Sequence, residues 1–497
     1  MNRFLLSRRS LALIIFFIPF LGISQTEARR FTLEEALELA KYQSLDALNA
    51  KQQFRSSFWE YRSFKGDYLP QLKLSATIPD LQRVIQSIPV GGIQTYVPQQ
   101  YTQYSADLGL SQRIGLTGGT LSVSSGLKRL DNVINDSTTI SYLSTPINIG
   151  YSQPIFQYNP FKWERKLQPL KYSLAKRKYL EDSEQVNITT TNYFFGLLQA
   201  QIEKKIALTN QSNYDTLYRI AKGRYQLGKI AENDLLLLEL NFLKAQAAVE
   251  NANLGLDNAL FRFKSYLRIK DTISFILVPP SNIVFTTVNP VLAVSEANKN
   301  SSASEDFQRQ LLEAARDVNF AKMDGRFDAK LTAVFGYNQT APSLEKAYHS
   351  ALDQEQVTLG LDIPILDWGV ARGKIKMAES KQEIVKNSVE QEIIDFERNV
   401  YLKVIQLNMQ KNQLRIAAKS DTVARKTYEV TKGRYLIGKI NSILDLNNAQ
   451  IENDNAEKSY YEALQTYWRS CFELRKMTLY DFLRNEQLQF NFEDVKP

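Results

Sequence analysis

Cysteine and histidine are almost absent from this 497-residue chain, which has one residue of each. A zinc site needs three or four nitrogen, sulfur or oxygen ligands, and a serine or cysteine nucleophile needs a base beside it. The composition therefore argues against metal-dependent and nucleophilic catalysis. We predict a protein that is not an enzyme and that carries no cofactor.

Glycine and proline are also scarce, at 21 and 15 residues, so long uninterrupted elements are expected. The longest apolar stretch, residues 11–23, is too short to span a bilayer and follows three arginines. This pattern predicts a secretory signal peptide over residues 1–24. Because no later apolar run reaches transmembrane length, a membrane role would have to use strands.

Charges of both signs are interleaved along the chain, with 61 Lys and Arg against 53 Asp and Glu. Nucleic-acid binding requires a concentrated basic face. We therefore predict no nucleic-acid partner.

A repeat divides the chain into two similar halves. KGRYQLGKI at residues 222–230 recurs as KGRYLIGKI at residues 432–440, with seven of nine positions identical at an offset of 210. The same offset aligns Tyr218 with Tyr428, and QPIF at residues 153–156 with IPIL at residues 363–366. Two matches in one register indicate a duplicated unit.

Each half contains a very long helical pattern. Residues 160–226 and 369–436 would form helices about 100 Å long at 1.5 Å per residue. Apolar residues in the second follow steps of three and four, which predicts coiled-coil-like packing against neighbouring helices. These positions are Ile393, Phe396, Val400, Val404, Leu407, Leu414 and Ala418.

The repeated motif predicts the turn of a helical hairpin. Gly228 and Gly438 can adopt positive φ and end the long helices, and Ser442 is placed to cap the returning helix. A purely local turn explains the glycines, but it does not explain why Arg and Tyr are repeated with them. A functional role for the motif stays open beside the local one.

Segments of alternating apolar and polar residues lie between the helices, four in residues 71–156 and two in residues 329–366. In the first, Leu72 and Leu74 alternate with Lys73 and Ser75. A water-lined barrel facing lipid requires this pattern, and a soluble sheet with one buried face has the same period. The predicted signal peptide favours the barrel.

These patterns divide the chain into five parts. After the signal peptide, residues 25–270 form the first repeat, with strands within 71–156 and a helical hairpin over 160–270. Residues 271–302 are predicted to be an inter-repeat linker with little regular structure. The second repeat covers 303–477, with strands within 329–366 and a hairpin over 369–477, and a C-terminal tail occupies 478–497.

The ordered set of motifs resembles the TolC family of outer-membrane efflux ducts. The resemblance rests on FTLEEALELA at residues 31–40, SQPIF and DIPILDWG at the strand ends, and the duplicated GRYxxGKI turns. The likeness runs from about Phe31 to Leu479. It implies an α+β membrane protein in which duplicated halves form a trimeric outer-membrane β-barrel, continuous with a periplasmic α-helical barrel.

The resemblance also implies a function and partners. Members of the family are outer-membrane channels of tripartite efflux pumps or type I secretion systems. A homotrimer in outer-membrane lipid, extending into the periplasm, would work with a periplasmic adaptor and an inner-membrane pump. The alternative is a secreted helical coiled-coil scaffold or adhesin without a channel.

The family closes its idle channel at the periplasmic helix tips, where adaptors dock. By matching position, the candidates at this end are Arg224, Tyr225, Gly228, Asp234, Arg434, Tyr435, Gly438 and Asp445. An acid that faces a three-fold axis forms a ring of three carboxylates that attracts cations, and Asp234 and Asp445 are the candidates for this role. A carboxylate that stabilises a helix N-terminus is the alternative.

The strand count departs from the family, which has two strands in each half. The four segments of the first half leave two possibilities: a hairpin around residues 117–120 joins the barrel, or it folds elsewhere. We expect the family count of four strands per chain.

Overall fold

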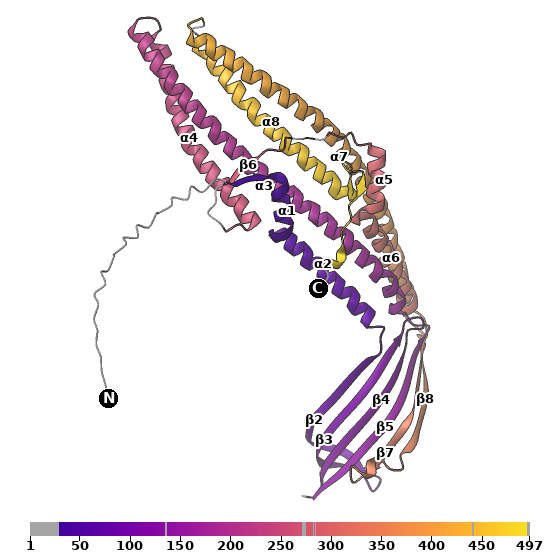
Figure 1. Ribbon diagram of the computed structural model, residues 1–497. Coiled ribbons are helices and arrows are strands. Elements are labelled where there is room, and N and C mark those ends of the chain that lie inside the picture. Colours follow the sequence, from indigo (N-terminus) through magenta and orange to yellow (C-terminus); the bar gives the residue numbers. More distant parts are fainter. Residues whose placement is uncertain are drawn as a thin grey trace, which may run out of the picture.

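A computed structural model describes residues 29–134, 137–270, 275–281, 283, 285–439 and 442–494. The predicted signal peptide lies outside these ranges. The molecule is elongated, with helical hairpins at one end and a curved sheet at the other (Figure 1).

The first two helices begin with side-chain caps. β1 (Arg29–Thr32) leads into α1 (Leu33–Gln43), and Thr32 and Glu35 exchange side-chain to backbone hydrogen bonds of 3.3 and 2.9 Å. This capping box satisfies two N–H groups that the helix leaves unpaired. Ser44 then caps α2 (Leu45–Gly66), which runs to the sheet.

One antiparallel sheet of six strands forms the far end of the molecule. The first half supplies β2 (Gln71–Val90), β3 (Ile93–Ile114), β4 (Gly119–Ile134) and β5 (Ser137–Ile155), and the second half supplies β7 (Asp328–Ala341) and β8 (Leu352–Asp362). The strand order is β2-β3-β4-β5-β7-β8. A short 3₁₀ helix, η1 (Lys346–Tyr348), lies between the last two strands.

The expected count of four strands was wrong. The turn at residues 115–118 joins β3 to β4 within the sheet, and these two strands pair from Ile114 with Gly119 to Gln100 with Val133. The alternating pattern of all four segments reflects this continuous pairing, because each strand has one apolar and one polar face.

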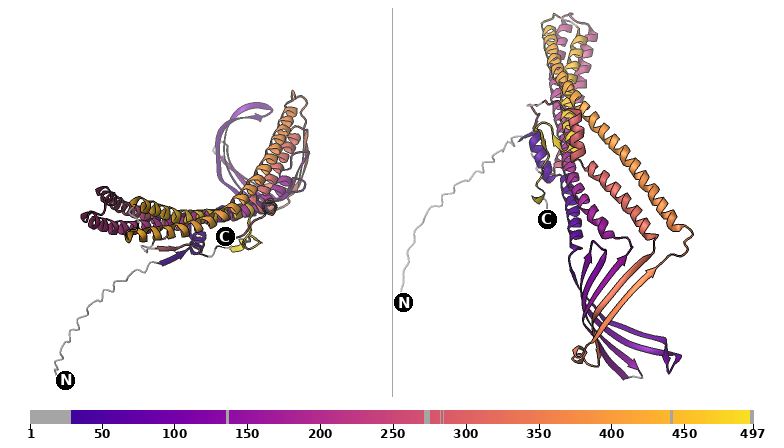
Figure 2. Two further views of the ribbon diagram at one scale, coloured as in Figure 1. Left: turned by 90° about the horizontal axis from the view of Figure 1, so that it is seen from above. Right: turned by 90° about the vertical axis from the view of Figure 1, so that its right-hand side faces the viewer.

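The two faces of the sheet differ in chemistry and in curvature. Leu72, Leu110, Val123, Ile149 and Phe335 lie opposite one another on successive strands, so they share one face. The other face carries small and polar residues. A Cβ atom at Gly150 would lie 2.6 Å from Ser122 Oγ, so the small-residue face is crowded. The apolar face is the more exposed of the two. Figure 2 shows that the sheet curves into an arc.

Both repeats contain the same pair of long helices. α3 (Pro160–Gln226) and α7 (Val370–Leu436) have 67 residues each, about 100 Å. Each turns back into a shorter helix of 36 residues, α4 (Glu232–Leu267) and α8 (Ile443–Thr478). Nearer the sheet, α2 packs against α3, and α6 (Ser302–Asp324) packs against α7. Of the predicted coiled-coil stripe, Val400, Val404, Leu407 and Leu414 are buried.

The segment between the repeats is more regular than expected. β6 (Phe275–Val278) pairs in parallel with β1, and α5 (Pro290–Asn300) packs against α7 and α8. The prediction of little regular structure was wrong because these short elements depend on partners distant in sequence. The chain ends in β9 (Tyr480–Asp481), β10 (Glu486–Gln487) and the 3₁₀ helix η2 (Phe492–Asp494).

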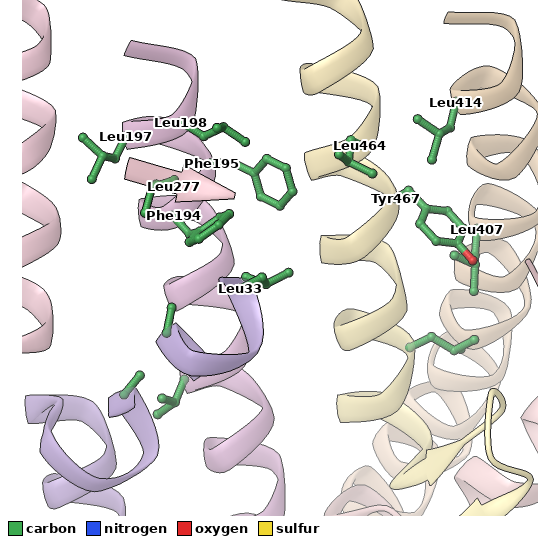
Figure 3. Close-up of a cluster of buried hydrophobic side chains, with 14 of the residues drawn as sticks. Leu33, Phe194, Phe195, Leu197, Leu198, Leu277, Leu407, Leu414, Leu464 and Tyr467 are labelled. Atoms are coloured by element: carbon green, nitrogen blue, oxygen red, sulfur yellow. The ribbon is translucent and has the colours of Figure 1, made fainter. Parts of the chain in front are cut away.

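The main core lies midway along the helices, where both repeats meet. Figure 3 shows Leu33 from α1 and Leu277 from β6 beside four residues of α3: Phe194, Phe195, Leu197 and Leu198. In the same view Leu464 and Tyr467 of α8 face Leu407 and Leu414 of α7. This core holds the two hairpins side by side. A second cluster lies at the hairpin tips and includes Leu217, Leu238, Tyr435 and Leu446.

Within the ranges described above, no helix is both long and apolar enough to cross a bilayer.

Candidate functional site

The two hairpin tips have the same turn geometry. Gly228 has φ +66° and Gly438 has φ +73°, the left-handed region that suits glycine. Lys229 N–H donates to Arg224 O at 2.9 Å, and Lys439 N–H donates to Arg434 O at 3.0 Å. With the bonds from Gly228 and Gly438 to the tyrosine carbonyls, this is the Schellman arrangement that ends a helix. The prediction that both glycines end the long helices is confirmed.

The identical motifs make different contacts beyond the turn. Arg224 is half-buried, and its Nη2 donates to Tyr435 O at 3.3 Å and Leu436 O at 3.2 Å. Its guanidinium carbon also lies 5.2 Å from the centre of the Tyr435 ring. A cation at a helix C-terminus stabilises the unpaired carbonyls there, so Arg224 of the first repeat stabilises the end of α7.

The tyrosines of the motif also differ. Tyr435 is 1% exposed within the tip cluster, whereas Tyr225 is 40% exposed. Burial raises the pKa of the Tyr435 phenol, and nearby Arg224 acts in the opposite direction. The structure therefore brings Arg224 and Tyr435 together, and leaves Tyr225 on the surface.

Arg434 and Asp445 lie together on a different surface. Both line an open groove between α7 and α8 with a volume of about 1350 Å³, and Asn448 and Glu452 line it too. Asp445 is in the first turn of α8, where Ser442 Oγ accepts a hydrogen bond from its N–H at 3.2 Å. The predicted cap by Ser442 is confirmed, and the N-terminal position suits a carboxylate.

Asp234 occupies the equivalent place in the first repeat. It lies in the first turn of α4, and its N–H donates to Ala231 O at 3.1 Å. Ala231 is the N-cap of α4 and offers no side-chain cap, in contrast to Ser442. An acid in the first turn therefore contributes more of the N-terminal stabilisation in α4 than in α8.

Polar contacts between the hairpins were not predicted from the sequence. Asn213 of α3 donates to Tyr428 Oη at 3.0 Å and accepts from Lys432 Nζ at 2.7 Å. Further along α3, Asn210 donates to Asp454 of α8 at 2.6 Å. The repeat aligns Tyr428 with Tyr218, but no local pattern indicates that Tyr428 faces the other hairpin.

A buried ionic group lies in the middle of the molecule. Arg475 of α8 contacts Glu184 of α3 at 3.0 Å and Asp481 of the tail at 3.3 Å, and both carboxylate side chains are 6% exposed. Burial raises the pKa of Glu184, and Arg475 counteracts this effect. The group joins α3, α8 and the tail after α8.

Across the part of the chain that the structure describes, no group of three or more His, Cys, Asp and Glu side chains is arranged to hold a metal ion.

Comparisons with known proteins agree with the fold. Residues 329–478 match the family described as Outer membrane efflux protein. No curated protein sequence matches the chain significantly. Among solved structures, the Campylobacter jejuni CmeC outer membrane channel is 16% identical with a TM-score of 0.64, over 93% of this chain and 88% of that one. The outer-membrane channel OprN has the same identity and TM-score, over 90% and 89%.

A third similar structure describes an open channel. The Neisseria gonorrhoeae MtrE outer membrane channel, solved in its open state, is 13% identical with a TM-score of 0.55, over 92% of this chain and 91% of that one. The fold thus extends over nearly all of the described chain, while the family match covers most of the second repeat. Residues 329–478 thus match the family of outer membrane efflux proteins, and the described chain as a whole has the fold of solved outer-membrane channels.

Proposed function

We propose that the chain works as a homotrimer that carries substrates from a periplasmic adaptor and an inner-membrane pump across the outer membrane. The observation that carries this proposal is the pairing of two long hairpins with one open sheet. Helices of about 100 Å match the scale of the periplasm, and a six-stranded open sheet cannot enclose water alone. Three copies supply both a tunnel of helices and a closed barrel.

The helix tips are the proposed closure of the tunnel. Arg224 holds the end of α7 against the first hairpin, so the two hairpins of one chain move as a unit at the tip while this contact is intact. Asp234 and Asp445 are proposed to face the three-fold axis in the trimer. Each would then form a ring of three carboxylates that favours cations at the entrance.

The exposed parts of the same turns are the proposed adaptor contact. Tyr225 and Arg434 are on the surface at the tips, together with the glycines at the turns. Aromatic and arginine side chains are frequent anchors of protein interfaces. Tyr435 is buried and therefore unsuited to direct contact with an adaptor, although its neighbours in sequence match those of Tyr225.

A pair of photo-crosslinking variants tests this assignment. A photoreactive residue replaces Tyr225 in one variant and Tyr435 in the other, each in the full chain in its own cell envelope. We expect Tyr225 to capture a periplasmic adaptor and Tyr435 to capture none. Equal capture at both positions, or capture of no adaptor at Tyr225, would contradict the proposed contact.

The trimer itself is tested by mass. The protein is extracted from outer membranes in detergent, and light scattering measures the protein mass of the particle. Three times the mass of one mature chain supports the channel. A single-chain particle that stays in solution without detergent would refute it and would favour a secreted scaffold.

A further inference from the structure

We propose that three copies of this chain close an 18-stranded barrel, in which β8 of one copy pairs with β2 of the next. The proposal rests on the proposed trimer and adds the strand count and the identity of the joined edges. All six strands belong to one continuous sheet, with β2 at one edge and β8 at the other. Three copies of six strands give 18.

The directions of the edge strands allow this closure. Every neighbouring pair in the sheet is antiparallel, so the six strands alternate in direction and β2 runs opposite to β8. β2 begins where α2 ends, and β8 ends where α7 begins, so each edge strand has one end at the helical side of the sheet. Joining β8 to the next β2 keeps the antiparallel pattern around the ring. It also pairs backbone groups that an edge strand in lipid would leave unsatisfied.

The faces of the two edge strands also match. Leu72 and Leu74 of β2 are 67% and 68% exposed, and Leu359 and Leu361 of β8 are 56% and 62% exposed. All four belong to the apolar face, because paired residues across the sheet share a side. A one-residue slip would turn one strand's apolar residues toward the water-filled side. Even-numbered residues in the first part of β2, residues 71–77, must therefore lie opposite odd-numbered residues of β8.

The main competing arrangement leaves one hairpin outside the barrel. β4 and β5 cannot be that hairpin, because β5 pairs with β7 from Ile155 to Tyr142 and β4 lies between β3 and β5. Of the strands of the first half, only the edge hairpin of β2 and β3 could leave, which would make β4 the edge and give 12 strands. That arrangement would place the exposed leucines of β2 and β3 in water. The hydrophobic effect therefore favours 18 strands.

The strand count sets the width of the membrane section. At equal tilt, barrel diameter grows roughly in proportion to strand number, so 18 strands give about 1.5 times the diameter of 12 and about twice the cross-section.

Cysteine pairs distinguish the two barrels. Ser75 of β2, Ser124 of β4 and Thr358 of β8 are on the polar face, opposite the apolar one. The first variant combines Ser75→Cys with Thr358→Cys, and its control combines Ser124→Cys with Thr358→Cys. Gln356→Cys and Gly360→Cys replace Thr358→Cys in further pairs to cover neighbouring registers. The native Cys471 is a suitable background because burial raises the pKa of its thiol to about 12.

Oxidation is performed on the full chain in outer membranes, and covalent species are separated in denaturing gels. In the 18-stranded barrel, at least one Ser75→Cys pair forms covalent dimers and trimers, and no Ser124→Cys pair does. Crosslinks from Ser124→Cys without any from Ser75→Cys overturn the proposal.

Electron microscopy of the extracted trimer then counts strands independently of crosslinking. Eighteen strands support the proposal, and 12 overturn it while leaving the channel function intact. A particle of one chain removes both the barrel and the proposed function.

Discussion

Arg224 provides a direct test of how the two hairpins are held together at their tips. The change Arg224→Ala removes two hydrogen bonds to the carbonyls of Tyr435 and Leu436 and the contact with the Tyr435 ring. Arg434→Ala is the matched control, since Arg434 has the same place in the repeated motif but is exposed on the groove between α7 and α8.

The size of the effect follows from these contacts. A cation over an aromatic ring contributes about 0.5 to 1 kcal/mol at exposed sites. The two hydrogen bonds are long and partly exposed, so they add less than the 1.5 to 3 kcal/mol typical of hydrogen bonds to charged groups. We expect Arg224→Ala to lower the free energy of opening the tip by about 1 to 2 kcal/mol. At about 1.4 kcal/mol for a tenfold change in an equilibrium constant, this corresponds to an open state that is populated about 5- to 30-fold more.

Hydrogen exchange of backbone amides measures this opening. Mass spectrometry follows the peptide that covers the end of α7 in detergent-extracted protein, under conditions where the exchange rate reports the equilibrium between closed and open states. Arg224→Ala should accelerate exchange at this end, while Arg434→Ala leaves it near the wild-type rate. Equal rates in the two variants would mean that the cap on α7 contributes nothing to tip stability.

Three further changes test other parts of the structure. Gly228→Ala should lower the stability of the tip by about 1 kcal/mol, because Gly228 has a positive φ. Gly223→Ala, in the helix before the turn, should raise this stability by up to about 1 kcal/mol. Hydrogen exchange of backbone amides at the α3 tip distinguishes the two signs. Arg475→Met should lower the free energy of unfolding by about 3 kcal/mol, because two buried carboxylates lose the cation between them. This loss should be smaller at pH 5 than at pH 8 in thermal unfolding, since burial raises the pKa of Glu184 and the fold favours its neutral form as pH falls. Asp445→Lys should reduce the cation preference of single channels in planar bilayers, and an unchanged preference would assign this residue to the helix N-terminus alone.

Local signals predicted the elements whose causes are local. The cap by Ser442 and the positive φ of Gly228 each depend on a few neighbouring residues, and each was recognised from the sequence. The long helices were predictable because little interrupts their pattern. Hairpins joined by short turns made the pairing of these helices predictable too.

The failed prediction for the segment between the repeats involves partners far away in the chain. β6 has only four residues, and it forms a strand because β1, about 245 residues earlier, pairs with it. The strand count failed for another reason: the alternating pattern indicated four segments in the first half, and the analogy with the family replaced that count with a smaller one. The alternation of apolar and polar residues was the better evidence for the strand count. It reflects the two faces of each strand, and each of these strands pairs with a neighbour in a hairpin.

The different contacts of the repeated motif follow from the way that two equivalent hairpins pack. α3 packs against α8, so only one side of each hairpin meets the other within the chain. On that side Arg224 reaches the end of α7 and Tyr435 is buried. Their counterparts, Arg434 and Tyr225, necessarily face away from this contact. In a closed ring the outward side of one chain meets the neighbouring chain. One copy of the duplicated motif can then make the contact within its own chain, and the other copy can make contacts with other chains. Duplication alone would make the copies equivalent, and it is the one-sided packing of the hairpins that separates their roles.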